Sequence, residues 1–73
     1  MRSKNTRKDV AARLKQAREK AGYASAKDFC QKNGLSLEIY LTHERGEIPI
    51  GSSKALRYCR LLRLSLHELL VGD

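Results

Sequence analysis

The lysines and arginines of this 73-residue chain offer its clearest chemistry, which is the binding of polyanions. They number 15 against 8 aspartates and glutamates, giving a formal net charge of +7 and a pI near 9.9. One group crowds the first twenty residues, at Arg2, Lys4, Arg7, Lys8, Arg13, Lys15, Arg18 and Lys20. A second recurs every three residues, at Lys54, Arg57, Arg60 and Arg63. Two such groups in so small a chain favour a phosphate-bearing partner.

Residues suited to catalysis or metal binding form no set in this sequence. His43 and His67 complete no ligand set at a usual spacing, and there is no C-x-x-C pair. Cys30 and Cys59 fall at apolar helix positions, so we expect buried thiols, with a disulfide only where core packing brings them together. No nucleophile–base or carboxylate pair stands out, and a chain this short cannot readily enclose a deep cavity. We therefore expect neither an enzyme nor a bound cofactor or metal.

The most informative stretch for the fold is 26–45, AKDFCQKNGLSLEIYLTHER. It places a small residue, a glycine and two inward-facing residues at Cys30, Gly34, Tyr40 and His43. That spacing fits two short helices crossing at a tight turn, because Gly34 can adopt left-handed backbone angles. Ser36 is placed to cap the second of these helices. The pattern predicts a helix-turn-helix, whose second helix usually enters the DNA major groove.

Capping signals and helical spacing predict an all-α fold of five helices, in one domain at 6–73 behind a flexible basic arm at 1–5. Capping pairs at Thr6 and Asp9, Ser25 and Asp28, and Ser65 and Glu68 begin three helices, and Ser52 or Ser53 is expected to cap a fourth. Gly22 ends the first helix, and a helix at about 37–45 stops at Gly46. The positions expected to face the core are Val10, Leu14, Ala17, Ala21, Phe29, Cys30, Leu35, Tyr40, His43, Ala55, Tyr58, Cys59 and Leu62.

From about Val10 to Gly72 the chain resembles the five-helix DNA-binding domain of the Cro-like and phage-repressor (XRE-type) family. The resemblance rests on RLKQAREKAG, IYLTHERG and LLRLSLHELLVGD, which stand in the family's order. It implies a phage-repressor-like fold and a sequence-specific DNA-binding transcription regulator, a repressor of bacterial or phage type, acting on double-stranded DNA. No apolar stretch approaches the roughly 20 residues that span a bilayer, so we expect a cytoplasmic protein without a membrane partner.

The resemblance also assigns roles to side chains by position. The base-edge candidates on the third helix are Leu37, Glu38 and Thr42. The phosphate candidates are Ser36, Arg45, Lys27, Lys54 and Arg57. In and beside the arm, the candidates for the minor groove or phosphate are Arg2, Lys4 and Arg7. Leucines and a glutamate are poor donors of hydrogen bonds to bases, so we expect weak direct readout, with affinity from basic residues and DNA shape.

Two further positions carry structural expectations from the same resemblance. Arg18 and Glu44 stand where relatives form an ion pair, so we expect one that locks the first helix to the third. Arg63 stands where relatives commonly have glycine in a left-handed conformation. Because that conformation strains any other residue, we expect the fourth helix to end differently. The charge of Arg63 is then available to phosphate or to the last carbonyls of the helix.

Alternatives remain open at this point. Leu66, Leu69, Leu70 and Val71 either form a homodimer surface or only close the small core. Leu37, Ile39 and Leu41 suggest an apolar patch on the third helix, which would make the domain a protein-interaction module, such as an antitoxin or co-regulator. RNA binding is a third reading, since positive charge does not distinguish nucleic acids.

Overall fold

Five helices make up the part of the chain that the computed structural model describes, residues 6–72. They are α1 (Arg7–Lys20), α2 (Ala26–Asn33), α3 (Leu37–Glu44), α4 (Ser52–Leu62) and α5 (Leu66–Leu70). No strand occurs in residues 6–72, so the expected all-α class is confirmed. Among these residues no helix combines the length and the apolar character that crossing a membrane demands.

The helix starts follow the local capping signals, with one exception. Thr6 with Asp9 and Ser65 with Glu68 form complete capping boxes, and Ser25 accepts the N–H of Asp28. The expected serine cap of α4 was wrong, because α4 already begins at Ser52. Its N-cap is Gly51, which offers no side chain to the first N–H groups.

Two helices end on a left-handed residue. Gly34 ends α2 as predicted, and its N–H donates to the carbonyl of Cys30. Arg63 ends α4 with φ 58° and ψ 47°, and its N–H donates to the carbonyl of Cys59. The expectation that α4 ends differently at this residue was therefore wrong. The arginine takes the conformation that glycine would take at lower cost, because the backbone hydrogen bond requires it.

The core is a column of aromatic rings surrounded by aliphatic side chains. Tyr23, Phe29, Tyr40 and Tyr58 follow one another with ring centroids 5.0, 5.1 and 5.3 Å apart. Most of the predicted core is confirmed, at Leu14, Phe29, Cys30, Tyr40, His43, Ala55, Tyr58, Cys59 and Leu62. Ala21 was predicted to face inward but is exposed, because α1 stops at Lys20.

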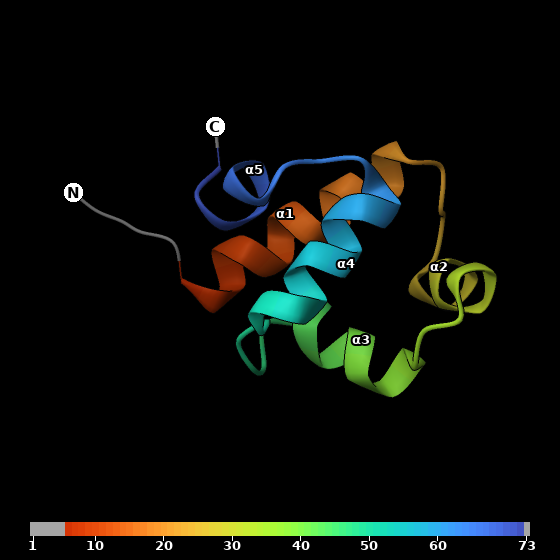
Figure 1. Ribbon diagram of the computed structural model, residues 1–73. Coiled ribbons are helices and arrows are strands. Elements are labelled where there is room, and N and C mark those ends of the chain that lie inside the picture. The colour runs from red at the N-terminus through yellow and green to blue at the C-terminus, as the bar shows by residue number, and fades with distance from the viewer. Residues whose placement is uncertain (1–5, 73) are drawn as a thin grey trace.

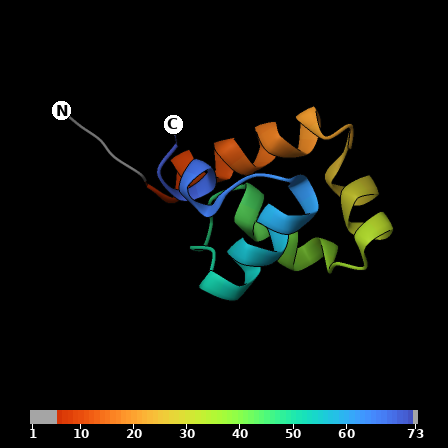
Figure 2. The ribbon, with the colours of Figure 1, turned by 45° about the horizontal axis from the view of Figure 1, so that its top comes forward.

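The helices are arranged so that α2 and α5 lie towards opposite ends of α1 (Figure 1). Figure 1 shows α1 behind α4, with α2 on the right, α3 below and α5 at the upper left. The second view shows α5 against the N-terminal half of α1 and α2 beyond the other end of that helix, while α3 runs beneath α1 between them (Figure 2). This arrangement leaves one side of α3 exposed to solvent.

Candidate nucleic-acid interface

The turn between α2 and α3 fixes where the third helix begins. Gly34 has φ 67° and ψ 36°, and the N–H of Leu35 donates to the carbonyl of Cys30 over 2.9 Å. Cys30 is buried, as expected of a small side chain near a helix crossing. Ser36 accepts the N–H of Ile39 over 3.4 Å at the start of α3. The predicted turn geometry is confirmed, and it leaves most of the first turn of α3 at the surface.

The inner side of α3 is held by contacts with α4. Tyr40 and His43 are buried, and each packs against the ring of Tyr58, with centroids 5.3 and 5.7 Å away. His43 Nδ1 and the Tyr58 hydroxyl share a hydrogen bond of 2.8 Å. Burial, and then the charge of Lys54, lowers the pKa of His43, while burial raises the pKa of Tyr58 to about 12. Both groups are therefore neutral near pH 7, as the expected core role of His43 requires.

A buried ion pair anchors α3 to α1. Arg18 Nε donates to Glu44 Oε1 over 2.8 Å, and the two side chains are 4% and 11% exposed. The Tyr40 hydroxyl donates to the same oxygen over 2.7 Å, and Arg18 Nη1 donates to the carbonyl of Tyr23 over 2.7 Å. Burial alone would lower the pKa of Arg18, but the hydrogen bond and charge of Glu44 outweigh it and raise that pKa. The expected ion pair is confirmed.

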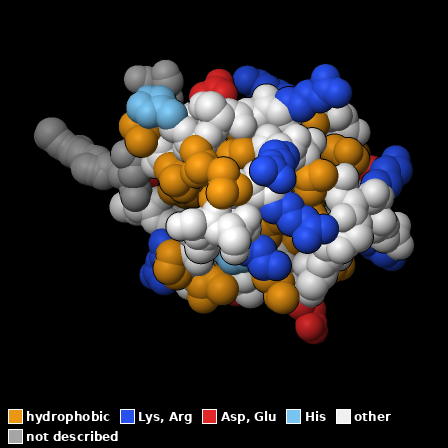
Figure 3. Space-filling model, in the orientation of Figure 1, with side chains coloured by type: hydrophobic (Ala, Val, Ile, Leu, Met, Phe, Trp, Pro, Cys, Tyr) orange, Lys and Arg blue, Asp and Glu red, His pale blue; other side chains and the backbone are white. Residues whose placement is uncertain are grey.

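Two cations of α4, Arg57 and Lys54, act on the segment formed by α2 and α3. Arg57 Nη2 is 3.5 Å from the carbonyl oxygen of Asn33, directly before the turn into α3. Lys54 lies near His43 in the last turn of α3, where its charge is second to burial in lowering the histidine pKa. Figure 3 shows Lys and Arg side chains spread over this face among hydrophobic ones, with Asp and Glu only near its edges. A basic flank therefore accompanies α3.

The outward face of α3 is narrower than the sequence predicts. Glu38 is exposed and Ile39 is 45% exposed. Leu37, a base-edge candidate, is instead half-buried and packs against the core. Thr42 is also half-buried, and its hydroxyl donates to the carbonyl of Ile39 over 2.6 Å. Leu41 is half-buried as well. The apolar patch expected on this helix is thus reduced to Ile39, with Leu41 at its margin.

Some of the remaining phosphate candidates are exposed, and one is engaged in a bond within the domain. Ser36, Lys27 and Arg45 are exposed, although Arg45 Nη1 lies 4.0 Å from Glu47 Oε2. Arg7 is the first residue of α1, and its Nη1 donates to the carbonyl of Glu47 over 3.0 Å. Arg7 therefore joins the start of α1 to the loop after α3. Arg2 and Lys4 of the expected arm lie outside the described residues.

The start of α1 packs closely on the loop that follows α3. A Cβ on Gly46 would lie 3.2 Å from Lys8 Cα and Cγ, and Gly46 itself has φ 73°. Both the contact and the backbone angle therefore favour glycine at this position. The close approach places the beginning of α1 beside the end of the third helix.

The candidate dimer residues separate into core and surface. Leu69 is fully buried, and Leu66 is half-buried against the core, so these two close the domain and do not offer a dimer surface. Leu70 and Val71 remain, and they are 37% and 48% exposed. A five-residue helix has few inward positions, and Leu66 and Leu69 occupy them where α5 packs against α1 and α4.

Arg13 is the structurally important residue that the sequence does not reveal. Its Nε donates to the carbonyl of Leu69 over 2.8 Å, and its Nη2 donates to the carbonyl of Leu70 over 3.0 Å. These bonds satisfy carbonyls at the end of α5, which have no partner within that helix. The partners are 56 and 57 residues away in the chain, so no local signal points to them.

Comparisons of the chain with protein-family models, with curated proteins and with solved structures found no match.

Proposed function

We propose that this protein is a sequence-specific DNA-binding transcription regulator, a repressor, that places the first turn of α3 in the major groove. The observation that carries the proposal is the contact of Arg57 with the carbonyl of Asn33, directly before a first turn of α3 that is largely exposed. The charge of Lys54, which acts on His43 in the last turn of α3, adds to it. Cations flanking a helix that can enter a groove are suited to the phosphates on either side of it. The anchor formed by Arg18 and Glu44 would hold that helix in a fixed orientation.

The exposed part of α3 suits a limited readout of base edges. The Glu38 carboxylate can accept a hydrogen bond from a cytosine amino group, and Ile39 can contact a thymine methyl group. The Thr42 hydroxyl still has acceptor capacity, because it is the donor in its bond to Ile39. Few direct hydrogen bonds are available here. Most of the affinity would therefore come from phosphate contacts, and part of the specificity from DNA shape.

Phosphate contacts would come from the edges of the interface. Arg57, Lys54, Lys27 and Arg45 are the candidates within the described residues. The N-terminus of α4 adds its free N–H groups, since Gly51 provides no side-chain cap. Arg2 and Lys4 precede α1, which begins beside the loop after α3. We propose that these two residues extend the contact to the neighbouring minor groove.

A homodimer on a pseudo-palindromic site, with half-sites about 34 Å apart, belongs to the same proposal. Leu70 and Val71 are the side chains that would form its contact. Sedimentation equilibrium of wild type and Val71→Asp, with and without DNA, would test it. A monomeric mass in both proteins, including on the selected site, would remove the dimer from the proposal.

The test of DNA binding is a salt series with duplex DNA, comparing random sequence with a site selected from a random pool. We expect strong salt dependence and a preference for the selected site. Arg57→Gln and Lys54→Gln should each reduce the slope of log K against log salt by about 1. Lys20→Gln removes the same charge from the far end of α1 and serves as the matched control, with little change in slope expected.

The outcomes separate the readings. Equal slopes for Arg57→Gln and Lys20→Gln would mean that binding is diffuse, and the proposed docking would be wrong. No binding at about 50 mM salt would overturn DNA binding altogether. Tighter binding of single-stranded or duplex RNA than of DNA would favour RNA binding instead.

The contribution of α3 itself is tested by Glu38→Gln. This change should alter preference at one or two base pairs, because an amide reads bases differently from a carboxylate. It should also strengthen binding to all sequences slightly, since it removes a negative charge close to phosphate. An unchanged preference across a randomised site would show that α3 does not read bases through Glu38.

A further inference from the structure

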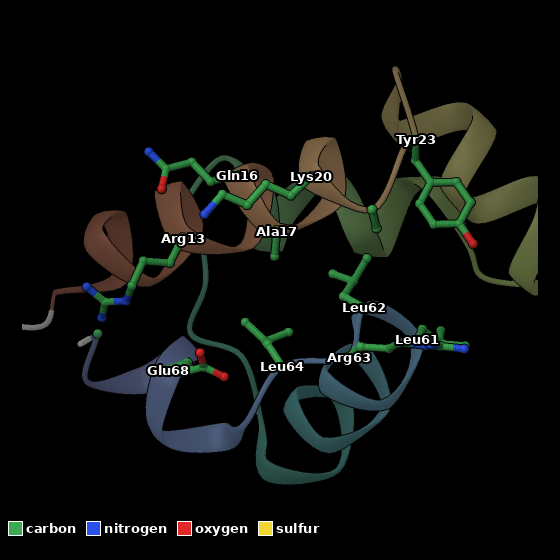
Figure 4. Close-up of a pocket in the computed structure, with 12 residues that line it drawn as sticks. Arg13, Gln16, Ala17, Lys20, Tyr23, Leu61, Leu62, Arg63, Leu64 and Glu68 are labelled. Carbon is green, nitrogen blue, oxygen red and sulfur yellow. The ribbon is translucent and has the colours of Figure 1, made fainter.

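A groove lies on the part of the molecule away from α3, between α1, the end of α4 and α5 (Figure 4). Its volume is about 820 Å³, and no residue of α2 or α3 lines it. Ala17, Leu62 and Leu64 form an apolar floor, and all three belong to the core or pack against it. Figure 4 shows that the side chain of Ala17 on α1 points towards Leu62 and Leu64, so the three meet along the floor of the groove. The groove is thus an apolar strip between two walls.

The rim of this groove is positively charged. Lys20 on α1 and Arg63 after α4 are exposed, and neither forms an ion pair within residues 6–72. Glu68 is the acidic residue among those that line the groove. Its carboxylate is already engaged, because Oε1 accepts the N–H of Ser65 over 2.8 Å at the start of α5. Hydrogen bonds with Ser65 lower the pKa of Glu68, and the charge of Lys20 is one of the further influences that lower it, so Arg63 is the rim cation that acts on no carboxylate in the described residues.

Arg63 has a strained backbone conformation, and within residues 6–72 its side chain makes no bond that would offset the strain. Its backbone is left-handed, where a glycine would be unstrained. Its side chain makes no hydrogen bond or ion pair in the described part of the chain. Backbone strain of this kind tends to be retained where a side chain has a function. The strained residue and the apolar floor are separate observations, and both point to this groove.

We infer that this groove docks an acidic amphipathic helix from a partner protein. The apolar stripe of such a helix would lie on Ala17, Leu62 and Leu64, and carboxylates beside the stripe would face Lys20 and Arg63. The cationic rim argues for an acidic partner and against a second copy of this basic chain, which carries a formal charge of +7. Because α3 takes no part, a DNA-bound protein could hold such a partner. The inference does not depend on DNA binding.

The probe is a labelled synthetic helix of about 18 residues, long enough to form when docked, with leucines at i, i+3, i+4 and i+7 and glutamates elsewhere. Fluorescence anisotropy gives its affinity for the full chain. We expect binding that a scrambled peptide of the same composition and a lysine analogue both lack. Lys20→Gln combined with Arg63→Gly should weaken the Kd about tenfold.

Arg63→Gly separates docking from stability, because relief of strain should make the variant more stable while it binds the peptide less well. Arg63→Lys keeps the charge and should bind nearly as wild type. Arg60→Gln is the matched control, since Arg60 is an exposed residue of α4 outside the groove. It should leave the affinity unchanged, as should Arg57→Gln, which tests DNA binding separately.

Amide and methyl chemical shifts locate the peptide on the protein. Shifts centred on Ala17, Leu62 and Leu64 support the inference. Shifts centred on Ile39 or Leu56 instead, equal binding of the scrambled peptide, or unchanged affinity in the double variant would each overturn it. Loss of DNA binding in the salt series would leave these results untouched.

Discussion

Arg18 and Arg63 differ in burial, in bonding and in backbone conformation. Arg18 is buried and bonded to Glu44 and to the carbonyl of Tyr23, and it joins α1 to α3. Arg63 is exposed on a left-handed backbone and has no partner in the described chain. The charge of Arg18 is fixed by buried bonds, whereas Arg63 has no such bonds within residues 6–72 and has backbone angles that are unfavourable for any residue except glycine.

The difference separates an arginine that stabilises the fold from one that does not. A buried charge is tolerated only when its bonds are complete, so the groups around Arg18 are fixed by each other. A strained residue without contacts contributes nothing to folding that a glycine would not supply. The orientation of α3 is therefore fixed by buried bonds, whereas the left-handed Arg63 is not required by any side-chain contact in the described residues.

The largest effect is expected from Glu44→Gln. This variant keeps the shape of the side chain but leaves the buried guanidinium of Arg18 without a counter-charge, at a cost of about 3–5 kcal/mol. A domain of this size has little more stability than that. Urea unfolding followed by circular dichroism should show a largely unfolded variant at 25 °C. A loss below about 1 kcal/mol would mean that the pair is no more than a surface contact.

Tyr58→Phe should have the next largest effect. It removes the hydroxyl that bonds to His43 Nδ1 and leaves a buried ring nitrogen without a partner, which costs about 1–3 kcal/mol. Tyr23→Phe is the matched control, because the Tyr23 hydroxyl makes no hydrogen bond within the described residues. Equal stabilities of the two variants would show that the His43 bond contributes nothing.

The buried histidine also makes stability depend on pH. Burial, and then Lys54, lowers the pKa of His43 in the folded protein below the usual 6.5. The unfolded chain therefore binds more protons at acidic pH. The contribution is fully present above about pH 6.5 and is lost as the pH falls from there through the folded pKa. Unfolding free energies at pH 7.5 and about pH 5.5 should differ in wild type, and the difference should shrink in His43→Gln.

Features set by neighbouring residues were predictable from the sequence, and features set by distant ones were not. The capping boxes at Thr6 and Ser65 and the turn at Gly34 involve side chains within a few residues of each other, so their spacing is visible. The ion pair of Arg18 and Glu44 spans 26 residues, and only a family resemblance pointed to it.

The candidate site was harder to predict because helical spacing does not say which neighbour covers a face. Leu37 is outward by spacing, yet it packs against the core. Leu69 suggested a dimer surface, but packing of α5 buries it completely. Arg57 could be placed on α4, but its position beside Asn33 depends on how α4 crosses the turn. In each case tertiary contacts decide the exposure of the side chain.

A gain in stability is expected from Arg63→Gly. Relieving the left-handed backbone should stabilise the fold by about 1 kcal/mol, less the extra entropy that a glycine gives to the unfolded chain. Thermal unfolding should show a higher midpoint than wild type. Arg63→Ala keeps a Cβ at the same backbone angles and should show no such gain. A destabilised Arg63→Gly would indicate that the arginine side chain supports the fold.

The smallest effect is expected from Lys32→Gln, which breaks an ion pair of the opposite kind from that of Arg18. Lys32 Nζ lies 3.3 Å from Asp28 Oδ1 on the surface of α2, and the two side chains are 66% and 35% exposed. Water already solvates both charges, so the loss should stay below about 0.5 kcal/mol and should shrink further in high salt. Since both pairs join a cation to a carboxylate, the contrast with Glu44→Gln measures what burial alone adds. If Lys32→Gln cost as much free energy of unfolding as Glu44→Gln, the attraction between the two charges, and not burial, would determine the cost of breaking either pair.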